Sequence, residues 1–211
     1  MVRTQDGRRR LLTALLSLVI GVGGLLATSC VLSPSSGKDP IPPDGDIDRK
    51  TIENLITKWL PDAYSTMDST AYADALDEAY IFELLEDEVD PGIPSSGWWE
   101  RSEELAIAGS MFTGRYNPEG IKVDGIDLKL QLKTNPTVDN TVYPDRPDGE
   151  IWYKATAYVD LTVITTNPTA SDGSGIVNYI VNSDQIFVCR PDPDADSLWV
   201  IRKQTDQKPI N

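Results

Sequence analysis

The sequence predicts an α+β protein in which helices precede a mainly antiparallel sheet. Between residues 52 and 112 apolar side chains recur at helical spacing, whereas from residue 126 onward they alternate with polar ones. Loops rich in proline, glycine, asparagine and aspartate separate the alternating runs, as in β-hairpins. Helices followed by a series of strands are typical of the α+β class.

Residues 1–29 have the layout of an export signal. A basic cluster, residues 8–10, precedes an apolar run from Leu11 to Leu26. The run is short of the roughly 20 residues that a spanning helix needs, although a plain membrane anchor stays open as an alternative. We therefore expect this segment to direct export of the chain.

The end of this segment, LATSC, resembles the lipobox of bacterial lipoproteins, with Ala27 where leucine is commonest. The resemblance implies cleavage after Ser29 and a diacylglycerol on Cys30, so palmitate-type chains would anchor the mature protein. The resemblance also implies that Val31, in place of aspartate, favours the periplasmic side of the outer membrane over the inner membrane. The alternative is an ordinary secretory signal with an incidental cysteine.

Composition excludes several classes of function. The chain has 19 Lys plus Arg, 33 Asp plus Glu, no histidine and a net charge of −14, so nucleic acid is not an expected partner. Without histidine, Ser-His-Asp and Cys-His catalysis and histidine metal sites are excluded. No catalytic residue, metal or cofactor is predicted, and Cys189, within the apolar run QIFVCR, is predicted to be a buried thiol.

Residues 30–48 are dense in proline, serine, glycine and aspartate and predict a flexible linker after the lipidated cysteine. Residues 49–211 are predicted to form one folded domain. Its first helix is expected from Ile52 to Met67, with Thr51 as the cap and Pro61 causing a kink or restart. A second helix is expected to begin near Asp68.

That second helix is expected to carry Tyr72, Ala75, Leu76 and Ala79 on one side, and AYIFELL is expected to form a short strand after it. A third helix is expected across WWERSEELAIAGSMF, with Gly109 allowing another element to approach closely. Strands are then predicted near residues 126–132, 150–165, 176–189 and 198–203.

The order of these elements, with AYSTMDSTAYADALDEAYIFELLEDE, WWERSEELAIAGSMF and LWVIRKQTD, resembles the nuclear transport factor 2-like superfamily, which includes SnoaL-type cyclases and ketosteroid isomerases. The resemblance implies a curved sheet wrapped around helices to leave a conical cavity. It implies no particular activity, because fold does not determine function.

Five residues are candidates for the wall of a pocket in such a cone, the alternative being a tight, dry core. They are Tyr64, Phe82, Trp99, Met111 and Trp199. Alternation places Asp160 on the outer face of its strand, so it is not assigned a catalytic role.

The outer face of the strand at 150–165 is unusually aromatic for a solvent surface, and its members are Trp152, Thr156, Tyr158, Thr162 and Ile164. Two interpretations stay open: a homodimer interface, as the resemblance implies, or cover by the loop TVYPDRPDG. Asp192, Asp194 and Asp196 match the start of a calcium loop, but glycine and glutamate are missing further on, so a hairpin turn is predicted.

Three functions follow. The first is a membrane-tethered, non-catalytic lipoprotein that binds a small apolar ligand or another envelope protein. The second is a histidine-independent isomerase or cyclase-type lyase acting on a small apolar substrate, which requires a buried acid facing the cavity. The third is a structural dimerisation or assembly module.

Overall fold

The computed structural model describes residues 47–84, 97–167 and 175–207. The predicted signal, Cys30 and nearly all of the predicted linker lie outside the described residues. Within the described ranges, none of the helices has the length and apolar character needed to cross a bilayer.

A seven-stranded sheet dominates the described part of the chain. Its strands are β1 (Leu76–Glu83), β2 (Trp98–Glu100), β3 (Lys122–Leu132), β4 (Thr137–Val138), β5 (Tyr153–Thr166), β6 (Ile176–Pro191) and β7 (Trp199–Gln207). Their order is β2-β1-β7-β6-β5-β3, with β4 paired to β5; β1 and β7 run parallel, and the other pairs are antiparallel. The prediction of a mainly antiparallel sheet is confirmed.

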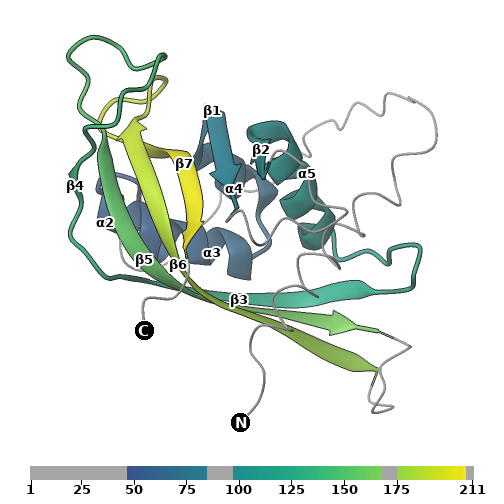
Figure 1. The fold of residues 1–211 in the computed structure, drawn as a ribbon. Coiled ribbons are helices and arrows are strands. Elements are labelled where there is room, and N and C mark those ends of the chain that lie inside the picture. The colour runs from purple at the N-terminus through teal and green to yellow at the C-terminus, as the bar shows by residue number, and fades with distance from the viewer. Residues whose placement is uncertain (1–46, 85–96, 168–174, 208–211) are drawn as a thin grey trace, which may run out of the picture.

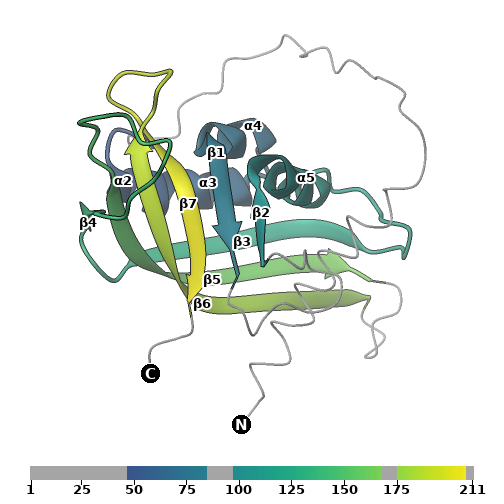
Figure 2. The ribbon, with the colours of Figure 1, turned by 45° about the horizontal axis from the view of Figure 1, so that its top comes forward.

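The sheet curves around the helices. Figures 1 and 2 show β5 and β6 bending along their length, with the helices on the concave side. The helical segments are α2 (Ile52–Asn54), η1 (Leu55–Trp59), α3 (Leu60–Ser65), α4 (Ser69–Asp74) and α5 (Arg101–Phe112). This arrangement confirms the predicted α+β cone.

The first helical segment continues through Pro61 and does not restart there, because a wider, π-helical turn precedes the proline. Thr51 accepts a hydrogen bond from the Asn54 amide at 3.0 Å, as predicted for the cap. The Leu60 amide then donates to the Leu55 carbonyl, five residues back, in the π-helical turn η1. Proline lacks an amide hydrogen and crowds the preceding turn, so a wide turn directly before Pro61 accommodates it without breaking the helix.

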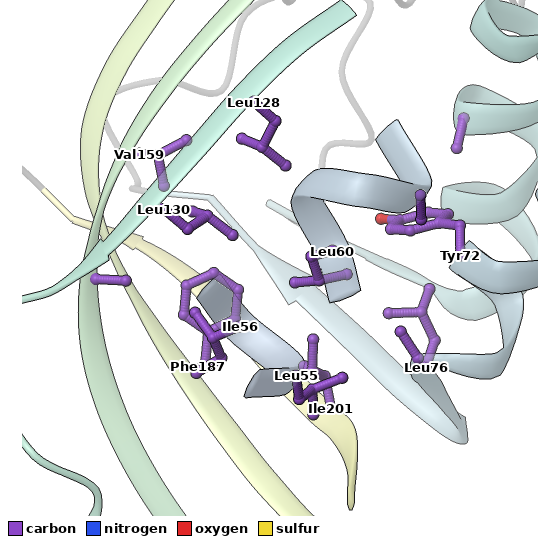
Figure 3. Packing of buried hydrophobic residues seen from close by; sticks show 14 of the residues in the cluster. Leu55, Ile56, Leu60, Tyr72, Leu76, Leu128, Leu130, Val159, Phe187 and Ile201 are labelled. Atoms are coloured by element: carbon purple, nitrogen blue, oxygen red, sulfur yellow. The ribbon is translucent and has the colours of Figure 1, made fainter. Parts of the chain in front are cut away.

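The core lies between these helical segments and the concave face of the sheet. Figure 3 shows Leu55, Ile56 and Leu60 directed toward side chains of the sheet. The sheet contributes Leu130, Val159, Phe187 and Ile201 to the same cluster. Cys189 is also fully buried there, as predicted, and burial raises the pKa of its thiol.

Two predicted helix boundaries are wrong. Leu76 and Ala79 lie in β1 instead of in the second helix, which ends at Asp74, and Trp98 lies in β2 instead of in the third helix. In both places the backbone pairs with a strand from another part of the sequence: β1 pairs with β7, and β2 pairs with β1. Helical periodicity in a single segment cannot reveal such a partner.

Gly109 does not make the close approach that we expected. A Cβ atom added to Gly109 would meet nothing within 4 Å. Replacing Gly109 by alanine should therefore stabilise the protein by about 0.5–1 kcal/mol, because glycine loses more backbone entropy in a helix than alanine does. Urea unfolding of Gly109→Ala measures this gain, and a loss of stability would show that a neighbour packs against this position.

The segment between β6 and β7 is a turn, as predicted. Asp192 accepts a hydrogen bond from the Asp194 amide at 2.9 Å and pairs with Arg49 at 3.1 Å. Ser197 has a positive φ of 65°. Among the described residues, no cluster of three or more acidic, cysteine or histidine side chains could hold a metal ion.

The outer face of β5 is covered at one end. Trp152 is fully buried, with the Tyr143 ring at 4.8 Å and the Arg146 guanidinium at 4.7 Å from its ring. Both side chains come from the loop TVYPDRPDG, so the loop interpretation holds for this tryptophan. Further along the face, Ile164 is exposed, and the dimer interpretation stays a prediction there.

Candidate functional site

A cavity of about 150 Å³ lies between the helices and the concave face of the sheet. Four of the five predicted pocket residues line it: Tyr64, Phe82, Trp99 and Met111. The sheet supplies an aliphatic and aromatic wall made of Leu128, Leu130, Val159, Leu161, Val181 and Phe187. Ligand binding by these residues stays a prediction, but the structure brings the four together around one space.

Trp199 does not line this cavity. Its ring packs edge-on against Tyr153, with 5.6 Å between the ring centroids, and its backbone amide donates to the Arg49 carbonyl. Trp199 therefore covers the core at the point where β7 begins.

A bulge in β7 places two residues that we did not predict in the wall of the cavity. Cys189 pairs with Ile201 but Val188 pairs with Lys203, so Arg202 is an extra residue in the strand. An extra residue reverses the alternation beyond it. As a result Gln204 and Asp206 line the cavity, although simple alternation from Trp199 would direct them outward.

The most distinctive polar group in the cavity is Glu104 on α5, which is 7% exposed. Its Oε1 accepts a hydrogen bond from the Tyr72 hydroxyl at 2.5 Å, and its Oε2 accepts one from the Trp99 Nε1 at 2.6 Å. The Tyr64 hydroxyl in turn donates to the Tyr72 hydroxyl at 3.3 Å. Tyr64 of α3 and Tyr72 of α4 thus form a chain of hydrogen bonds that ends on one oxygen of this carboxyl group, and Trp99 of β2 donates to the other oxygen.

Burial decides the charge state of this cluster. Removal from water raises the pKa of Glu104, and the hydrogen bonds from Tyr72 and Trp99 offset only part of that effect. Burial and the neighbouring Glu104 also raise the pKa of Tyr64 and of Tyr72, so both hydroxyls keep their protons. Glu104 is therefore the group in this cluster whose charge can change.

Sequence reasoning missed Glu104, yet a signal was present. Ala108, Met111 and Glu104 share one face of α5, at spacings of four, three and seven residues, and all three are buried. An acid in register with a buried stripe predicts either a paired charge or a functional carboxyl group.

Replacing Glu104 by glutamine should change how stability depends on pH. In the parent, the pKa of Glu104 is higher in the folded state than in the unfolded state. The stability that this difference contributes is fully present at a pH below the unfolded-state pKa. It is lost as the pH rises through the folded-state pKa, because the buried carboxyl group must then ionise. A tenfold change in the ionisation constant corresponds to about 1.4 kcal/mol. The advantage of Glu104→Gln over the parent should therefore grow with pH.

Urea unfolding across the pH range measures this difference. Glu119→Gln, at an exposed position, is the matched control and should follow the parent at every pH. If the unfolding free energy of Glu104→Gln has the same pH dependence as that of the parent, burial does not penalise the charged form of Glu104 as its position indicates.

A second polar row borders the cavity. The Tyr80 hydroxyl donates to Gln204 Oε1 at 3.1 Å, and Gln204 Nε2 donates to Gln185 Oε1 at 2.6 Å. Asp206, 5% exposed, lies beside Gln185 in the paired strands. Gln185, Gln204 and Asp206 thus add hydrogen-bonding groups to the wall of a largely apolar cavity, a combination typical of small-molecule sites.

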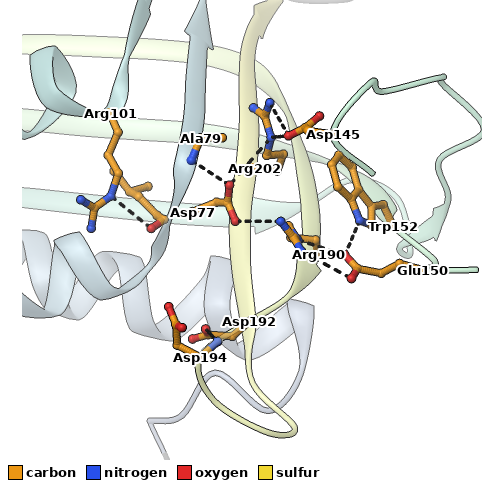
Figure 4. A network of polar contacts seen from close by, with 11 residues as sticks. Asp77, Ala79, Arg101, Asp145, Glu150, Trp152, Arg190, Asp192, Asp194 and Arg202 are labelled. Atoms are coloured by element: carbon orange, nitrogen blue, oxygen red, sulfur yellow. Dashed lines mark hydrogen bonds and ion pairs between the residues drawn. The ribbon is translucent and has the colours of Figure 1, made fainter. Parts of the chain in front are cut away.

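A separate network of charges lies outside the core, on the other face of the sheet (Figure 4). Asp77 lies 3.4 Å from Arg190 and 3.8 Å from Arg202, and it also accepts a hydrogen bond from the Ala79 amide. Arg202 pairs with Asp145 at 2.9 Å, and Arg190 pairs with Glu150 at 3.0 Å. The network joins β1, β6, β7 and the loop that covers Trp152, which indicates a structural role.

No protein-family model matches the sequence, and no curated protein sequence is significantly similar to it. Among solved structures, the chain is similar to a putative aromatic ring hydroxylase from Novosphingobium aromaticivorans, at 19% identity and a TM-score of 0.44, over 78% of this chain and 90% of that one. It is also similar to a ketosteroid isomerase-like protein from Erwinia carotovora atroseptica, at 14% identity and a TM-score of 0.40, over 71% of this chain and 88% of that one.

A third similar structure is a nuclear transport factor 2-like superfamily protein from Salmonella enterica, at 13% identity and a TM-score of 0.39, over 72% of this chain and 85% of that one. These similarities assign no activity to the chain. The α+β cone is established by the described helices and strands themselves.

Proposed function

We propose that the folded domain binds a small, largely apolar ligand in the cone cavity, and that Cys30 tethers the domain to a membrane. The observation that carries the first part is the largely apolar cavity itself, with the buried carboxyl groups of Glu104 and Asp206 in its wall. A cavity of about 150 Å³ lined by apolar side chains is large enough to admit benzene in another protein. The expected ligand is therefore about one ring in size, or a longer molecule that enters with one end.

Ligand binding is tested by screening envelope lipids and metabolites for a rise in melting temperature, with native mass spectrometry to identify what is bound. A ligand at 100 times its Kd adds about 2.7 kcal/mol to the unfolding free energy. Leu161→Phe, which fills part of the cavity wall, should abolish the rise, whereas Gly109→Ala should keep it. A protein that stays free of ligand and has a cavity closed in solution would contradict this proposal.

The tether is supported by the basic cluster, the apolar run and LATSC in the sequence. Labelling with palmitate should mark the parent and Cys189→Ser but not Cys30→Ser. Fractionation of membranes should place the labelled protein in the outer membrane. Equal labelling of Cys30→Ser and the parent would contradict the tether and would leave the cavity proposal unaffected.

A second candidate is a proton-transferring isomerase or cyclase-type lyase, because Glu104 meets the requirement for a buried acid that faces the cavity. A raised pKa lets a carboxyl group donate and accept a proton near neutral pH. Turnover of a cavity ligand that falls to background in Glu104→Gln, with binding retained, would support catalysis. Binding without turnover supports a receptor role.

A third candidate is dimerisation through the outer face of β5 and β6. Ile164, Ile176 and Ile180 are exposed there, and Thr162 pairs with Ile180 across the two strands. Sedimentation of the parent and of Ile180→Lys tests this interface, since the lysine should dissociate such a dimer. A parent that sediments as a monomer at high concentration would contradict it.

A further inference from the structure

We propose that the ligand of the cavity is a small organic cation, an ammonium group on an apolar body of about one ring, whose charge pairs with Glu104. The inference rests on the proposed function, because it specifies the ligand of the same cavity. It is carried by the direction of the hydrogen bonds, by the charges around the cavity and by the aromatic wall.

The hydrogen bonds around Glu104 suit a negative charge. Both carboxyl oxygens act as acceptors, one from Tyr72 and one from Trp99. The indole nitrogen of Trp99 can only donate a hydrogen bond. The Tyr72 hydroxyl, which donates to Glu104, itself accepts a hydrogen bond from the Tyr64 hydroxyl. Donors on both oxygens stabilise a carboxylate more than a neutral acid.

No positive side chain among the described residues balances this charge. The described residues that line the cavity include no lysine or arginine, and they include a second acid, Asp206. A buried carboxylate without a counter-ion is costly. Since the described lining supplies no counter-ion to Glu104, we assign the balancing charge to a proton in the free protein and to a cation when ligand is bound.

The aromatic wall fits the same ligand class. Tyr64, Tyr72, Phe82 and Trp99 line the space around Glu104, and the Phe82 and Trp99 rings are stacked with centroids 4.5 Å apart. Aromatic faces attract ammonium groups, most strongly where water is excluded. The net charge of −14 attracts cations to the protein and repels anions.

Cation binding should therefore release the proton held by Glu104, so affinity should rise with pH. The groups that face Glu104 are Tyr64 from α3, Tyr72 from α4 and Tyr80 from β1, all kept neutral by burial, and Asp206 lines the same cavity from β7. On α5 itself, the neighbouring Glu103 is exposed. Asp206 is the one other acid among the described residues that line the cavity.

The test compares three probes of one ring by titration calorimetry with the full-length protein: benzylamine as the cation, benzyl alcohol as its neutral analogue and benzoate as the anion. At about pH 8 we expect benzylamine to bind roughly tenfold more tightly than benzyl alcohol, a difference of about 1.4 kcal/mol, and benzoate not to bind. Benzylamine affinity should weaken toward about pH 5, with a proton released on binding.

Glu104→Gln is the decisive variant. Its amide can accept from Trp99 and donate to Tyr72, so the cavity should keep its shape and should still bind benzyl alcohol. The tenfold preference for benzylamine should disappear. A parent that binds both probes equally, or a Glu104→Gln variant that keeps the preference, overturns the cation inference but leaves the proposed cavity function. Failure of the parent to bind any of the probes counts against both.

Discussion

Replacing Asp77 by alanine is expected to lower the free energy of unfolding by about 3 kcal/mol, because it removes a buried carboxylate between the buried Arg202 and the partly buried Arg190. Asp77 is 4% exposed, and Arg202 is 7% exposed. Arginine cannot give up its proton, so in Asp77→Ala the positive charges of Arg190 and Arg202 have fewer carboxylate partners. Arg190 keeps Glu150 and Arg202 keeps Asp145, which places the expected cost at the lower end of the range for a broken buried pair.

Urea unfolding of Asp77→Ala measures the loss. The matched control is Glu78→Ala, the next residue, whose side chain is 80% exposed and pairs with Arg101 at 3.3 Å. An exposed pair contributes about 0–1 kcal/mol, so this control should stay close to the parent. Equal effects of the two substitutions would show that the network in Figure 4 does not hold β1, β6 and β7 together.

Replacing Trp152 by alanine is expected to cost about 3–5 kcal/mol, the largest effect that we expect for a single side chain in this protein. The side chain is fully buried between Tyr143, Arg146 and Arg190, and its Nε1 donates to Glu150 at 2.6 Å. Alanine leaves a void on the outer face of the sheet and removes the surface on which the loop packs.

Two variants define the origin of this loss. Trp152→Phe keeps most of the apolar area and should cost less, mainly the hydrogen bond to Glu150, at about 1–3 kcal/mol. Val142→Ala, in the same loop at a residue that is 90% exposed, should be nearly neutral. Thermal unfolding measures all three. A small effect of Trp152→Ala would show that the loop does not depend on this ring.

Periodicity was sufficient for the longer strands of the sheet. The alternation in residues 126–132 predicted β3, and in β5 the same alternation buries Ala155, Ala157 and Val163 in the core. Such strands have one face in the core and one face outside, so the pattern of apolar residues records the pairing directly.

Short elements and irregular ones were not predictable in this way. The strand β2, three residues long, and the bulge at Arg202 depend on partners elsewhere in the chain. The bulge explains why Gln204 and Asp206 were not assigned to the cavity. A single extra residue reverses every later side chain, and nothing in the local pattern marks where it occurs.

The sequence by itself determined the class of fold, most of the strands and the lack of histidine, because each of these depends on composition or local period. The resemblance to a cone-shaped fold added four residues that line the cavity. Only the tertiary structure decided that Glu104 faces the cavity, with Tyr72 and Trp99 as its donors. The physical reason is that the environment of a buried acid is built by side chains from several elements, and no segment read alone contains those distances.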